Sequence, residues 1–398
     1  MSKANDLLDL LVEACTSGGT AIRVVTTLAP AGGAADKVFA PTYATDTKGV
    51  STYAVERRAL SGGGEDTTVL LDSVQSQANR MEQALKEWWE ADETRLPMLV
   101  VQVPSGNRTM EITALDAPHR AADAIFRDSE HDGKPFRDSS LGQRFVRARP
   151  DDATSLFGIC PTALVFGQWD STADAGTAGA KFQRIVVSEI TGFGAVQGKR
   201  TSSRIDPLRI EKDAVEIYEA VDGFWTFDPK RARKDKKDQP VKSKPSEVNH
   251  GNVLPTVSDM GGFSVRRAEQ VTVLSFPALR RLRFPAADGT RDIKRDAAAR
   301  TVLAALALHA LCLMQEHGYD LRSRCLLQVV ERHAEYLGAT ASDGRPLALD
   351  PDLTEETLRL AVEQARRLGL PWEAGRLPLE PSVDLVKLVA LSVNATEA

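Results

Sequence analysis

The order of strand-like and helix-like segments is the sequence feature that most constrains this fold. Ala21–Leu28 (AIRVVTTL) has the apolar, β-branched composition of a strand. An amphipathic helix follows, because apolar residues recur there at spacings of three and four: Val74, Ala78, Met81, Leu85 and Trp88. After further strand patterns come a long helix pattern at Lys294–His317 and a last strand pattern at Cys325–Val330. This order predicts an α+β fold with a ferredoxin-like or RRM-like core.

Other segments are expected to surround this core. Helices are predicted at Asn5–Cys15, Thr354–Leu368 and Val383–Val393, and the helix near residue 74 is expected to begin at an N-cap, Asp72 or Ser73. Strands are predicted at Val69–Leu71, Pro97–Val103, Ala163–Trp169, Phe182–Ile190 and Val271–Leu274. Residues 104–150 are rich in glycine, proline and charge, and are predicted to be an irregular insertion.

Composition excludes several classes of protein. The 398 residues are 42% hydrophobic and 26% charged, as in ordinary soluble globular proteins, and they suffice to bury a large core. The most apolar stretch, Thr301–Met314, is too short for a bilayer and carries His309, so it predicts a buried helix and no membrane partner. The four cysteines form no CxxC pair, which argues against disulfides and cysteine-bound zinc and indicates the cytoplasm.

Charge is distributed unevenly along the chain. The whole sequence has a net charge of −5, which by itself disfavours a nucleic-acid partner. Residues 181–300, however, hold 24 Lys and Arg against 16 Asp and Glu, a local net charge of +8 that leaves −13 for the rest. This segregation is typical of proteins that bind nucleic acid on one surface, and it also suits head-to-tail self-assembly. Chance clustering of solvated charges is the third explanation.

The densest run of positive charge lies within residues 229–245. It comprises Lys230, Arg231, Arg233, Lys234, Lys236, Lys237, Lys242 and Lys244. Almost no apolar residue interrupts the run, so we expect it to bury no surface and to form a mobile loop. A flexible basic loop favours phosphate backbones without reading bases.

A glycine-rich segment at Thr191–Ser203 (TGFGAVQGKRTSS) follows a predicted strand but lacks the spacing of a nucleotide-binding loop. The phosphate loop of nucleotide triphosphatases needs glycine where Phe193 stands, and Ser or Thr where Arg200 stands. The segment leads into two adjacent cations, Lys199 and Arg200, with hydroxyls close by. It is either a phosphate cradle or a solvated loop.

Two further segments are rich in polar or basic residues, and each has both an RNA-binding and a purely structural explanation. On the amphipathic helix that begins near residue 74, Ser76, Asn79 and Arg80 lie near the helix N-terminus and either hold an RNA backbone or form a solvated face. In SFPALRRLRFP (275–285), arginines alternate with Phe and Leu, which suits base stacking with phosphate contact or an amphipathic turn over the core.

The segment PSEVNHGNV (245–253) places His250 near Glu247, a combination that suggests general acid–base chemistry. No second catalytic histidine or lysine is tied to it by spacing, and a turn rich in hydrogen-bonding groups explains it equally well. The six histidines form no HxH or HExxH pattern, so the sequence predicts no metal site and no cofactor.

Six segments together resemble a known family. They are DSVQSQANRME (72–82), LVFGQWDST (164–172), KFQRIVVSEITG (181–192), GKRTSSRIDPL (198–208), PSEVNHGNV (245–253) and EQVTVLSFPALRRLRFP (269–285). They are similar to the RAMP-superfamily backbone subunit of type I CRISPR Cascade complexes, most of all to the I-G (formerly I-U) version. The matching blocks run from about residue 20 to about residue 340.

The resemblance implies an RRM-like palm with finger and thumb insertions. Residues 1–340 would form this backbone-subunit domain, with a finger-like insertion at about 104–150 and the thumb and basic loop at about 193–262. Residues 341–398 would be a C-terminal helical extension packed on the core. Copies would stack head-to-tail along one CRISPR RNA and present its spacer for pairing with target DNA. The basic loop would contact target DNA or a neighbouring copy, and further partners would be the large subunit and the RNA-processing or end-capping subunit of Cascade.

Carried over block by block, the resemblance assigns RNA binding to twelve residues. They are Ser76, Asn79, Arg80, Lys181, Arg184, Lys199, Arg200, Ser203, Arg204, Asn249, His250 and Asn252. Backbone subunits of type III relatives cut target RNA with an aspartate, but no segment here identifies one, and Asp170 and Asp206 are the positions to compare. We therefore expect no catalytic residue. The alternative is an endoribonuclease that processes precursor RNA with His250 and either Glu247 or a nearby lysine.

Overall fold

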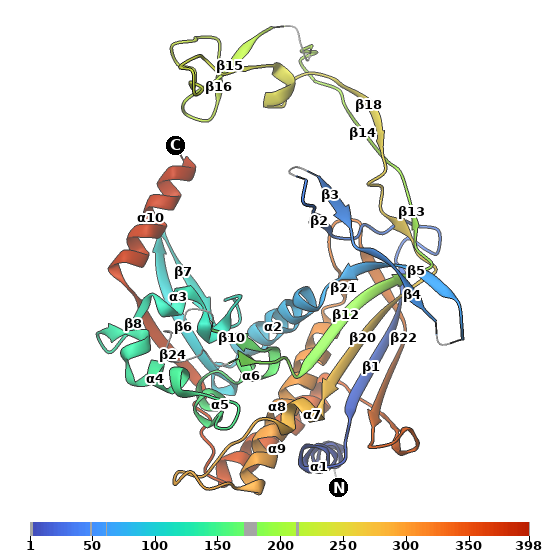
Figure 1. Cartoon of the computed structure of the whole chain (residues 1–398), viewed down its shortest axis with the longest axis vertical. Coiled ribbons are helices and arrows are strands. Elements are labelled where there is room, and N and C mark those ends of the chain that lie inside the picture. Colours follow the sequence, from blue (N-terminus) through green and yellow to red (C-terminus); the bar gives the residue numbers. More distant parts are fainter. Residues whose placement is uncertain (1–2, 48–49, 61, 171–180, 212–214, 398) are drawn as a thin grey trace.

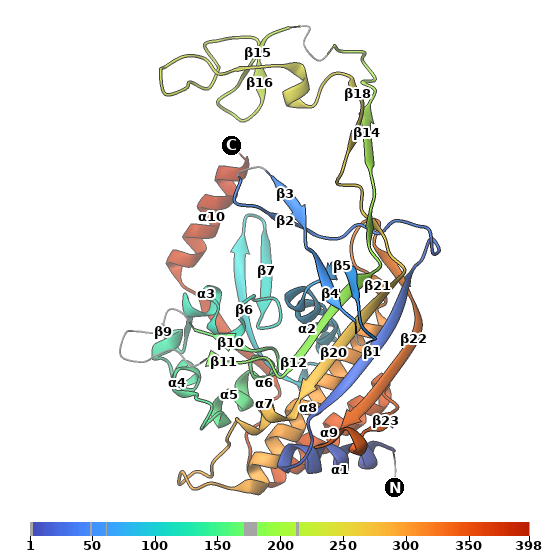
Figure 2. The same cartoon turned by 45° about the vertical axis from the view of Figure 1, so that its right-hand side comes forward.

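The computed structural model describes residues 3–47, 50–60, 62–170, 181–211 and 215–397. A large antiparallel sheet lies on one side of the molecule and a smaller sheet on the other, with helices between them (Figure 1). A long arm rises from one end of the large sheet and arches over the gap between the two sides, as the turned view also shows (Figure 2).

The large sheet contains the expected core. Its strand order is β21-β22-β1-β20-β12-β5-β4, and every pairing is antiparallel. The four central strands are β1 (Ala21–Pro30), β12 (Val186–Phe193), β20 (Arg267–Ser275) and β22 (Leu326–Leu337). With α2 (Val74–Ala91) after β1 and α8 (Ile293–Glu316) after β20, they form the split β-α-β-β-α-β arrangement of ferredoxin-like folds. The prediction of an α+β fold with an RRM-like core is confirmed.

Shorter strands extend both edges of this sheet. Beyond β12 lie β5 (Glu65–Asp72) and β4 (Val55–Ala59), and beyond β22 lie β21 (Tyr319–Asp320) and β23 (Arg345–Leu347). Side chains alternate along β1, so that Ile22 and Val24 are buried in the core that includes the helices while Arg23 points to the opposite face. There Arg23 pairs with Glu335 of β22. A separate hairpin is formed by β2 (Thr42–Ala44) and β3 (Ser51–Tyr53).

Helices α2 and α8 pack on the inner face of the large sheet, against β12 and β20. Three more helices pack on α8 in turn: α1 (Lys3–Thr16), α7 (Phe276–Arg280) and α9 (Pro351–Arg367). Helix α8 begins at the N-cap Asp292 and is followed by Gly318 with φ +80°. It is long and apolar enough to cross a membrane, but 94% of its apolar window is buried inside the protein, so the core explains its composition. The N-cap of α2 is Ser73.

The second sheet has the order β7-β6-β24-β8-β9. It consists of β6 (Pro97–Ser105), β7 (Arg108–Thr113), β8 (Ser129–His131), β9 (Lys134–Pro135) and β24 (Gly375–Pro381), with β24 parallel to β6. The C-terminal segment therefore contributes a strand as well as α9 and α10 (Val383–Glu397). This corrects the prediction that residues 341–398 form a helical extension. The interrupting prolines, Pro378 and Pro381, removed the strand pattern from the sequence.

Residues 104–150 are not irregular, contrary to prediction. Besides β7, β8 and β9, they form α3 (Ala124–Arg127) and α4 (Ser140–Arg147), with short 3₁₀ turns at Arg120–Ala122 and Phe136–Asp138. Each helix begins at a side-chain cap, Asp123 for α3 and Ser139 for α4. Elements of so few residues leave no periodic signal in the sequence, and only their packing against the core stabilises them.

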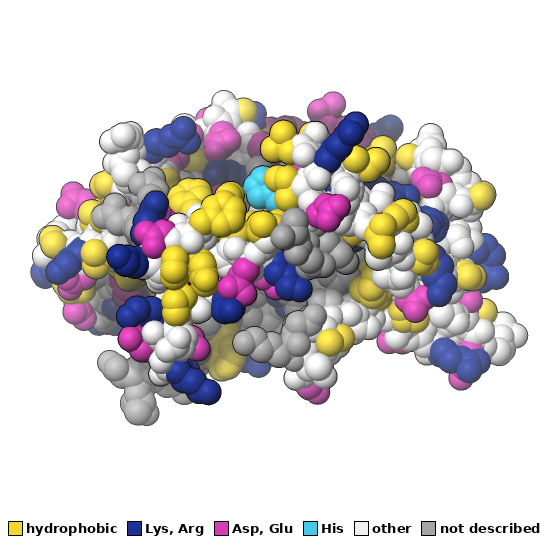
Figure 3. All heavy atoms as spheres, turned by 90° about the horizontal axis from the view of Figure 1, so that it is seen from above, with side chains coloured by type: hydrophobic (Ala, Val, Ile, Leu, Met, Phe, Trp, Pro, Cys, Tyr) yellow, Lys and Arg dark blue, Asp and Glu magenta, His cyan; other side chains and the backbone are white. Residues whose placement is uncertain are grey.

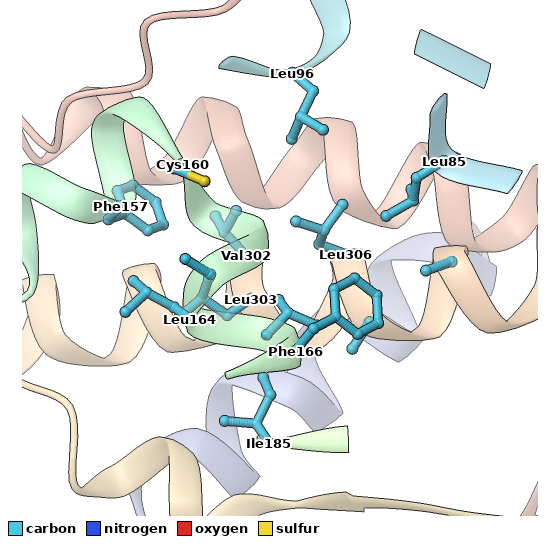
Figure 4. Packing of buried hydrophobic residues seen from close by; sticks show 14 of the residues in the cluster. Leu85, Leu96, Phe157, Cys160, Leu164, Phe166, Ile185, Val302, Leu303 and Leu306 are labelled. Atoms are coloured by element: carbon cyan, nitrogen blue, oxygen red, sulfur yellow. The ribbon is translucent and has the colours of Figure 1, made fainter. Parts of the chain in front are cut away.

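The predicted strand Ala163–Trp169 is wrong. The structure has α5 (Thr154–Ile159), α6 (Pro161–Phe166) and a short strand β10 (Gln168–Trp169) that pairs with β11 (Lys181–Phe182). Pro161 suits the first turn of a helix, and every residue of α6 is buried, so no period distinguishes helix from strand. In Figure 4, Leu164 and Phe166 point toward Val302, Leu303 and Leu306 of α8. Because β11 ends at residue 182, the predicted strand Phe182–Ile190 is also divided.

The arm comprises residues 196–264. At its base β13 (Val196–Gln197) pairs with β19 (Phe263–Ser264), and its shaft is the ribbon of β14 (Arg200–Arg204) and β18 (Val253–Ser258). Its end, residues 215–250, is called the arm tip below. The tip holds the small sheet β16 (Trp225–Thr226), β15 (Ile217–Glu219) and β17 (Lys242–Ser243), followed by a 3₁₀ turn at Pro245–Val248.

The expectation that the basic run of the arm buries no surface is wrong. Ala232, in the middle of that run, is buried against the tip and forms an isolated bridge with Ala220. The neighbouring Arg233 forms an ion pair with Glu219 of β15. Spacing along the chain did not reveal this, because the partners of Ala232 and Arg233 lie more than ten residues earlier.

Candidate nucleic-acid interface

A cleft of about 770 Å³ opens where the first turns of α2 meet β10 and β11. Its lining combines amides, cations and aromatic rings: Val74, Gln75, Asn79, His119, Arg120, Phe166, Gln168, Trp169, Lys181, Phe182, Gln183, Arg184 and Val187. These residues come from four separate stretches of the chain. The pairing of β10 with β11 and the packing of α6 on α8 bring them together.

Trp169 is the exposed aromatic residue of the cleft. Its side chain is 62% exposed, and the Nζ of Lys181 lies 5.7 Å from the centre of its ring. The two residues are cross-strand partners in the β10–β11 pair. A flat apolar ring beside a lysine can stack on a base while the ammonium group binds a phosphate.

The inner end of the cleft carries more positive than negative charge. Arg120 donates two hydrogen bonds to Glu82, at 2.6 and 2.7 Å, and a third to the carbonyl oxygen of Gly167 at 2.8 Å. Arg184 adds a second guanidinium, whose Nε is buried without a hydrogen-bond partner. One carboxylate therefore faces two arginines, and an anionic ligand would complete the cluster.

Burial shifts the ionisation of this cluster. It raises the pKa of the Glu82 carboxyl to about 7, although the Arg120 guanidinium acts in the opposite direction. Burial also lowers the pKa of the Arg184 guanidinium, and the nearby positive charge of Arg120 lowers it further. Both shifts have the sign expected when charges leave water, and a bound anion would offset the cost at Arg184.

Gly167 sets the shape of the cleft. Its φ of +81° turns the chain between α6 and β10, a conformation that residues with a side chain rarely adopt. A Cβ at this position would lie 2.9 Å from the backbone nitrogen of Arg184. The close approach of the two backbones places Trp169 and Arg184 in the same cleft.

Three of the twelve predicted RNA-binding residues, Asn79, Lys181 and Arg184, meet in this cleft. Ser76 and Arg80 lie on the same helix but contact Asp72 instead: the Ser76 hydroxyl donates to it at 2.8 Å and the Arg80 Nε at 3.0 Å. Arg80 also donates to the carbonyl oxygen of Leu321 at 2.7 Å. These contacts give both residues a structural role, and their part in RNA binding stays a prediction.

The other seven predicted residues lie on the arm: Lys199, Arg200, Ser203, Arg204, Asn249, His250 and Asn252. Arg200 and Ser203 are exposed on the shaft, whereas Lys199 forms an ion pair with Asp259. Asn249 has φ +61° and ends the 3₁₀ turn at Pro245–Val248. The arm thus separates these seven residues from the residues that line the cleft.

Asp206 organises the junction between shaft and tip. Its carboxylate accepts hydrogen bonds from the backbone N–H groups of Gly251 and Leu208, both at 2.8 Å, and these bonds hold the pKa of Asp206 below its usual range. Arg204 lies 3.6 Å from it and His250 3.9 Å. Asn252 accepts a hydrogen bond from the Asp206 N–H at 2.7 Å. Asp206, Arg204 and Asn252 therefore stabilise the junction.

The residues considered for catalysis have structural partners. The Glu247 carboxylate accepts hydrogen bonds from the Ser243 hydroxyl and the Lys244 N–H, both at 2.9 Å, which is a capping arrangement. Asp170 accepts from Arg137 at 2.8 and 2.9 Å. Within the described part of the chain, no group of three His, Cys, Asp or Glu residues is placed to hold a metal ion.

The segment 275–285 is an amphipathic turn over the core. Phe276 and Phe284 are fully buried, and Arg280 donates to the carbonyl oxygens of Ala14 and Gly19 at 2.7 and 2.9 Å. Arg283 lies 3.2 Å from the buried Asp296. Of the two explanations that the sequence left open, the structural one accounts for these contacts.

Sequence reasoning missed Trp169, Arg120 and Glu82. Trp169 stood at the end of a wrongly predicted strand, although its block LVFGQWDST was among those that carried the resemblance. Arg120 and Glu82 are 38 residues apart, and no spacing rule pairs them.

Residues 22–197 match the family described as CRISPR-associated protein GSU0053 (Cas_GSU0053). The match covers less than half of the chain, from β1 to β13, and includes every residue that lines the cleft. It supports a CRISPR-associated protein with a role in CRISPR defence, as the sequence motifs imply. No curated protein matches the chain.

Proposed function

We propose that this chain is a cytoplasmic, RNA-binding backbone subunit of a type I (I-G) Cascade complex, with several copies stacked head-to-tail along one CRISPR RNA. The observation that carries the proposal is the cleft, which is lined by the exposed Trp169, by Lys181 and by Arg184, whose buried Nε has no hydrogen-bond partner. That combination suits the backbone and bases of a single strand better than a small neutral ligand. The CRISPR-associated family match over the same residues adds to it.

The arm supports the head-to-tail part of the proposal. Both strands of its shaft are exposed, and apolar side chains stand out from and next to it: Val257 is 67% exposed, Leu254 71% and Ile205 87%. An isolated two-stranded ribbon is marginally stable in water, so burial of these side chains against a neighbour would stabilise it. In the assembly that neighbour would be the next copy along the RNA. The large subunit, the end-capping subunit and target DNA paired to the guide would complete the complex.

We propose no catalytic role for the chain. Glu247, one of the two partners considered for acid–base chemistry at His250, is engaged in a capping arrangement. A His250→Ala variant should leave precursor-RNA processing intact when the complete set of subunits is present. Loss of processing with retained RNA binding would instead establish the endoribonuclease alternative.

RNA binding is tested at the cleft. Lys181→Ala/Arg184→Ala should weaken binding of guide-length RNA equally for different guide sequences, because phosphates and not bases are contacted. The slope of log K against log salt should decrease by roughly 1.4, about 0.7 for each lost phosphate contact on a single strand. Fluorescence anisotropy across a salt series measures both quantities.

The matched control is Lys294→Ala/Lys387→Ala, which also removes two positive charges, here from exposed lysines that lie outside the cleft lining. It should bind RNA as the unmodified protein does. Equal affinity of the cleft variant and the control would refute the proposed site. A protein that purifies without RNA from cells expressing its CRISPR array would refute the proposed function.

A further inference from the structure

A buried carboxylate lies behind the lining of the cleft. Glu82 of α2 is 3% exposed and is not part of that lining, whereas Arg120 and Arg184 both belong to it. A ligand in the cleft therefore contacts the guanidinium groups and not the carboxylate. On the surface seen from above, positive and negative side chains are interspersed, and water and salt screen them from each other (Figure 3). Glu82 is shielded from water, so its charge acts on the cleft with little screening.

Hydrogen bonds fix this carboxylate and the Arg120 guanidinium to each other. Arg120 donates from Nε and Nη2 to the two carboxylate oxygens of Glu82, at 2.6 and 2.7 Å. Its Nη1 donates to the carbonyl oxygen of Gly167 at 2.8 Å, and the guanidinium lies 5.5 Å from the centre of the Phe166 ring. Arg120 thus joins α2 to the turn before β10, and Glu82 determines where the Arg120 charge stands in the cleft.

Glu82 and a bound phosphate would share the same two cations. Arg120 and Arg184 carry two positive charges against one carboxylate, so a phosphodiester with one negative charge would bring the sum to zero. The phosphate would also place a second anion close to Glu82 in a poorly hydrated site. A neighbouring negative charge favours the protonated form of a carboxyl group. Protonation of Glu82 would leave both guanidinium groups to the phosphate.

We propose that Glu82 takes up a proton when a phosphate of a nucleic-acid strand binds in the cleft, so that binding weakens as the pH rises above neutral. This inference rests on the proposed function, because it needs the cleft to be the nucleic-acid site, and it adds the residue that controls binding there. Glu82 is a positioning residue, since it holds Arg120 and does not contact the strand.

The ionisation of Glu82 gives the sign and the pH range. Burial raises its pKa to about 7, and a nearby phosphate would raise it further. Below about pH 7 the carboxyl is protonated in free and bound protein alike, so affinity should not change with pH. Above about pH 7 the free protein loses the proton first, and affinity should fall until the complex loses it too. A phosphate that raises this pKa to about 8 would lower affinity about tenfold in all.

Other ionisable groups near the cluster can be separated from Glu82. Among the described residues, the charged groups that face Glu82 are Arg120 and Arg184, and guanidinium groups keep their charge over this pH range. Cys160 lies close to Arg120, but burial raises the pKa of its thiol, so it stays neutral. The exposed His119 lines the cleft, and histidine titrates near neutral pH, so this residue needs its own variant.

The first test measures the affinity of the full-length protein for a mixed-sequence, guide-length RNA by fluorescence anisotropy, from about pH 6.5 to 8.5 at constant ionic strength. The unmodified protein should lose roughly fivefold in affinity over this range. Glu82→Gln should stay constant within about twofold. His119→Gln should keep the fall, whatever its affinity at the lowest pH. The matched control Glu335→Gln removes the carboxylate of an arginine pair outside the cleft and should also keep the fall.

A second measurement does not depend on how a variant folds. Calorimetric titration of the unmodified protein with the same RNA, in two buffers that differ in ionisation enthalpy, gives the number of protons bound. At about pH 7.5 we expect uptake of about half a proton per protein for a pKa that rises from about 7 to about 8.

Two results would overturn the inference. One is the absence of proton uptake together with an affinity that does not change with pH in the unmodified protein. The other is a Glu82→Gln variant that keeps the fall, which would assign the proton to another group. If Lys181→Ala/Arg184→Ala binds RNA as the unmodified protein does, the cleft itself is refuted. If that variant binds weakly and no proton is taken up, only the role of Glu82 fails, so the two failures are distinguishable.

Discussion

Replacing Asp72 with Asn removes a buried negative charge that four side chains share at the beginning of α2. The Asp72 carboxylate has no exposed surface. One oxygen accepts hydrogen bonds from Ser76 at 2.8 Å and Arg322 at 3.1 Å, and the other from Gln77 at 2.6 Å and Arg80 at 3.0 Å. The variant therefore tests whether Ser76 and Arg80 serve the fold, as their contacts indicate.

The expected cost follows from these contacts. An asparagine keeps one acceptor oxygen, but its NH₂ group would face two donors, so two hydrogen bonds to a charged group are lost at about 1.5–3 kcal/mol each. The Arg80 and Arg322 guanidinium groups would also keep their charge without the shared partner. Removing one member of a buried ion pair costs about 3–5 kcal/mol, and we expect Asp72→Asn to fall in that range.

Urea unfolding measures the loss of stability, and because urea is uncharged it does not screen the ion pairs. With a slope of about 3 kcal/mol per molar urea, a loss of about 3 kcal/mol lowers the midpoint by about 1 M. Glu335→Gln is the matched control, because it removes the carboxylate of an exposed pair with Arg23 and should cost at most about 1 kcal/mol. A change within about 0.5 kcal/mol for Asp72→Asn would refute the reasoning, as would a larger loss in the control.

Three further predictions concern the core and the cleft. Burial raises the pKa of Glu82 from 4.5 to about 7, so the folded state holds this proton more tightly than the unfolded state does. The free energy of unfolding should therefore fall by up to about 3 kcal/mol as the pH rises from about 4.5 to 7. In Glu82→Gln the urea midpoint should change less with pH over that range. All four thiols are buried, and burial raises the pKa of Cys15 to about 12, so a thiol reagent at pH 8 should label none in the native state and four after unfolding. A Cβ at Gly142 would lie 1.6 Å from the carbonyl oxygen of Phe136, so Gly142→Ala should lower the thermal midpoint, whereas Gly62→Ala, where no atom lies within 4 Å, should not.

The core of the fold was predictable because its signals are local. The helix pattern around Val74–Trp88 and the apolar run within Thr301–Met314 each identify one element by periodicity or length, and their order along the chain leaves few topologies. Segments buried on all sides, such as α6, gave no periodic signal and were assigned to the wrong structure. Short capped elements within residues 104–150 were missed for a related reason, since each is stabilised by what it packs against.

The residues predicted to bind RNA were also only partly placed correctly by the sequence. The resemblance pointed to Asn79, Lys181 and Arg184, and all three line the cleft. It also pointed to Ser76 and Arg80, which both donate hydrogen bonds to Asp72. Asn79 lies on α2 together with Ser76 and Arg80, so position on the helix could not separate the residue that lines the cleft from the two that contact Asp72. Which way each side chain turns depends on the buried carboxylate beside it.

By itself, the sequence determined the order of elements, the RRM-like core and the concentration of positive charge in residues 181–300, because these depend on the side chains of neighbouring residues. Only the tertiary structure decided where that charge is left unpaired. Ion pairs and caps formed over long separations neutralise Lys199, Arg233 and Arg283, while Lys181, Arg184 and three lysines of the arm tip make no ion pair with described residues. Coulomb interactions depend on distance in space, and folding sets those distances.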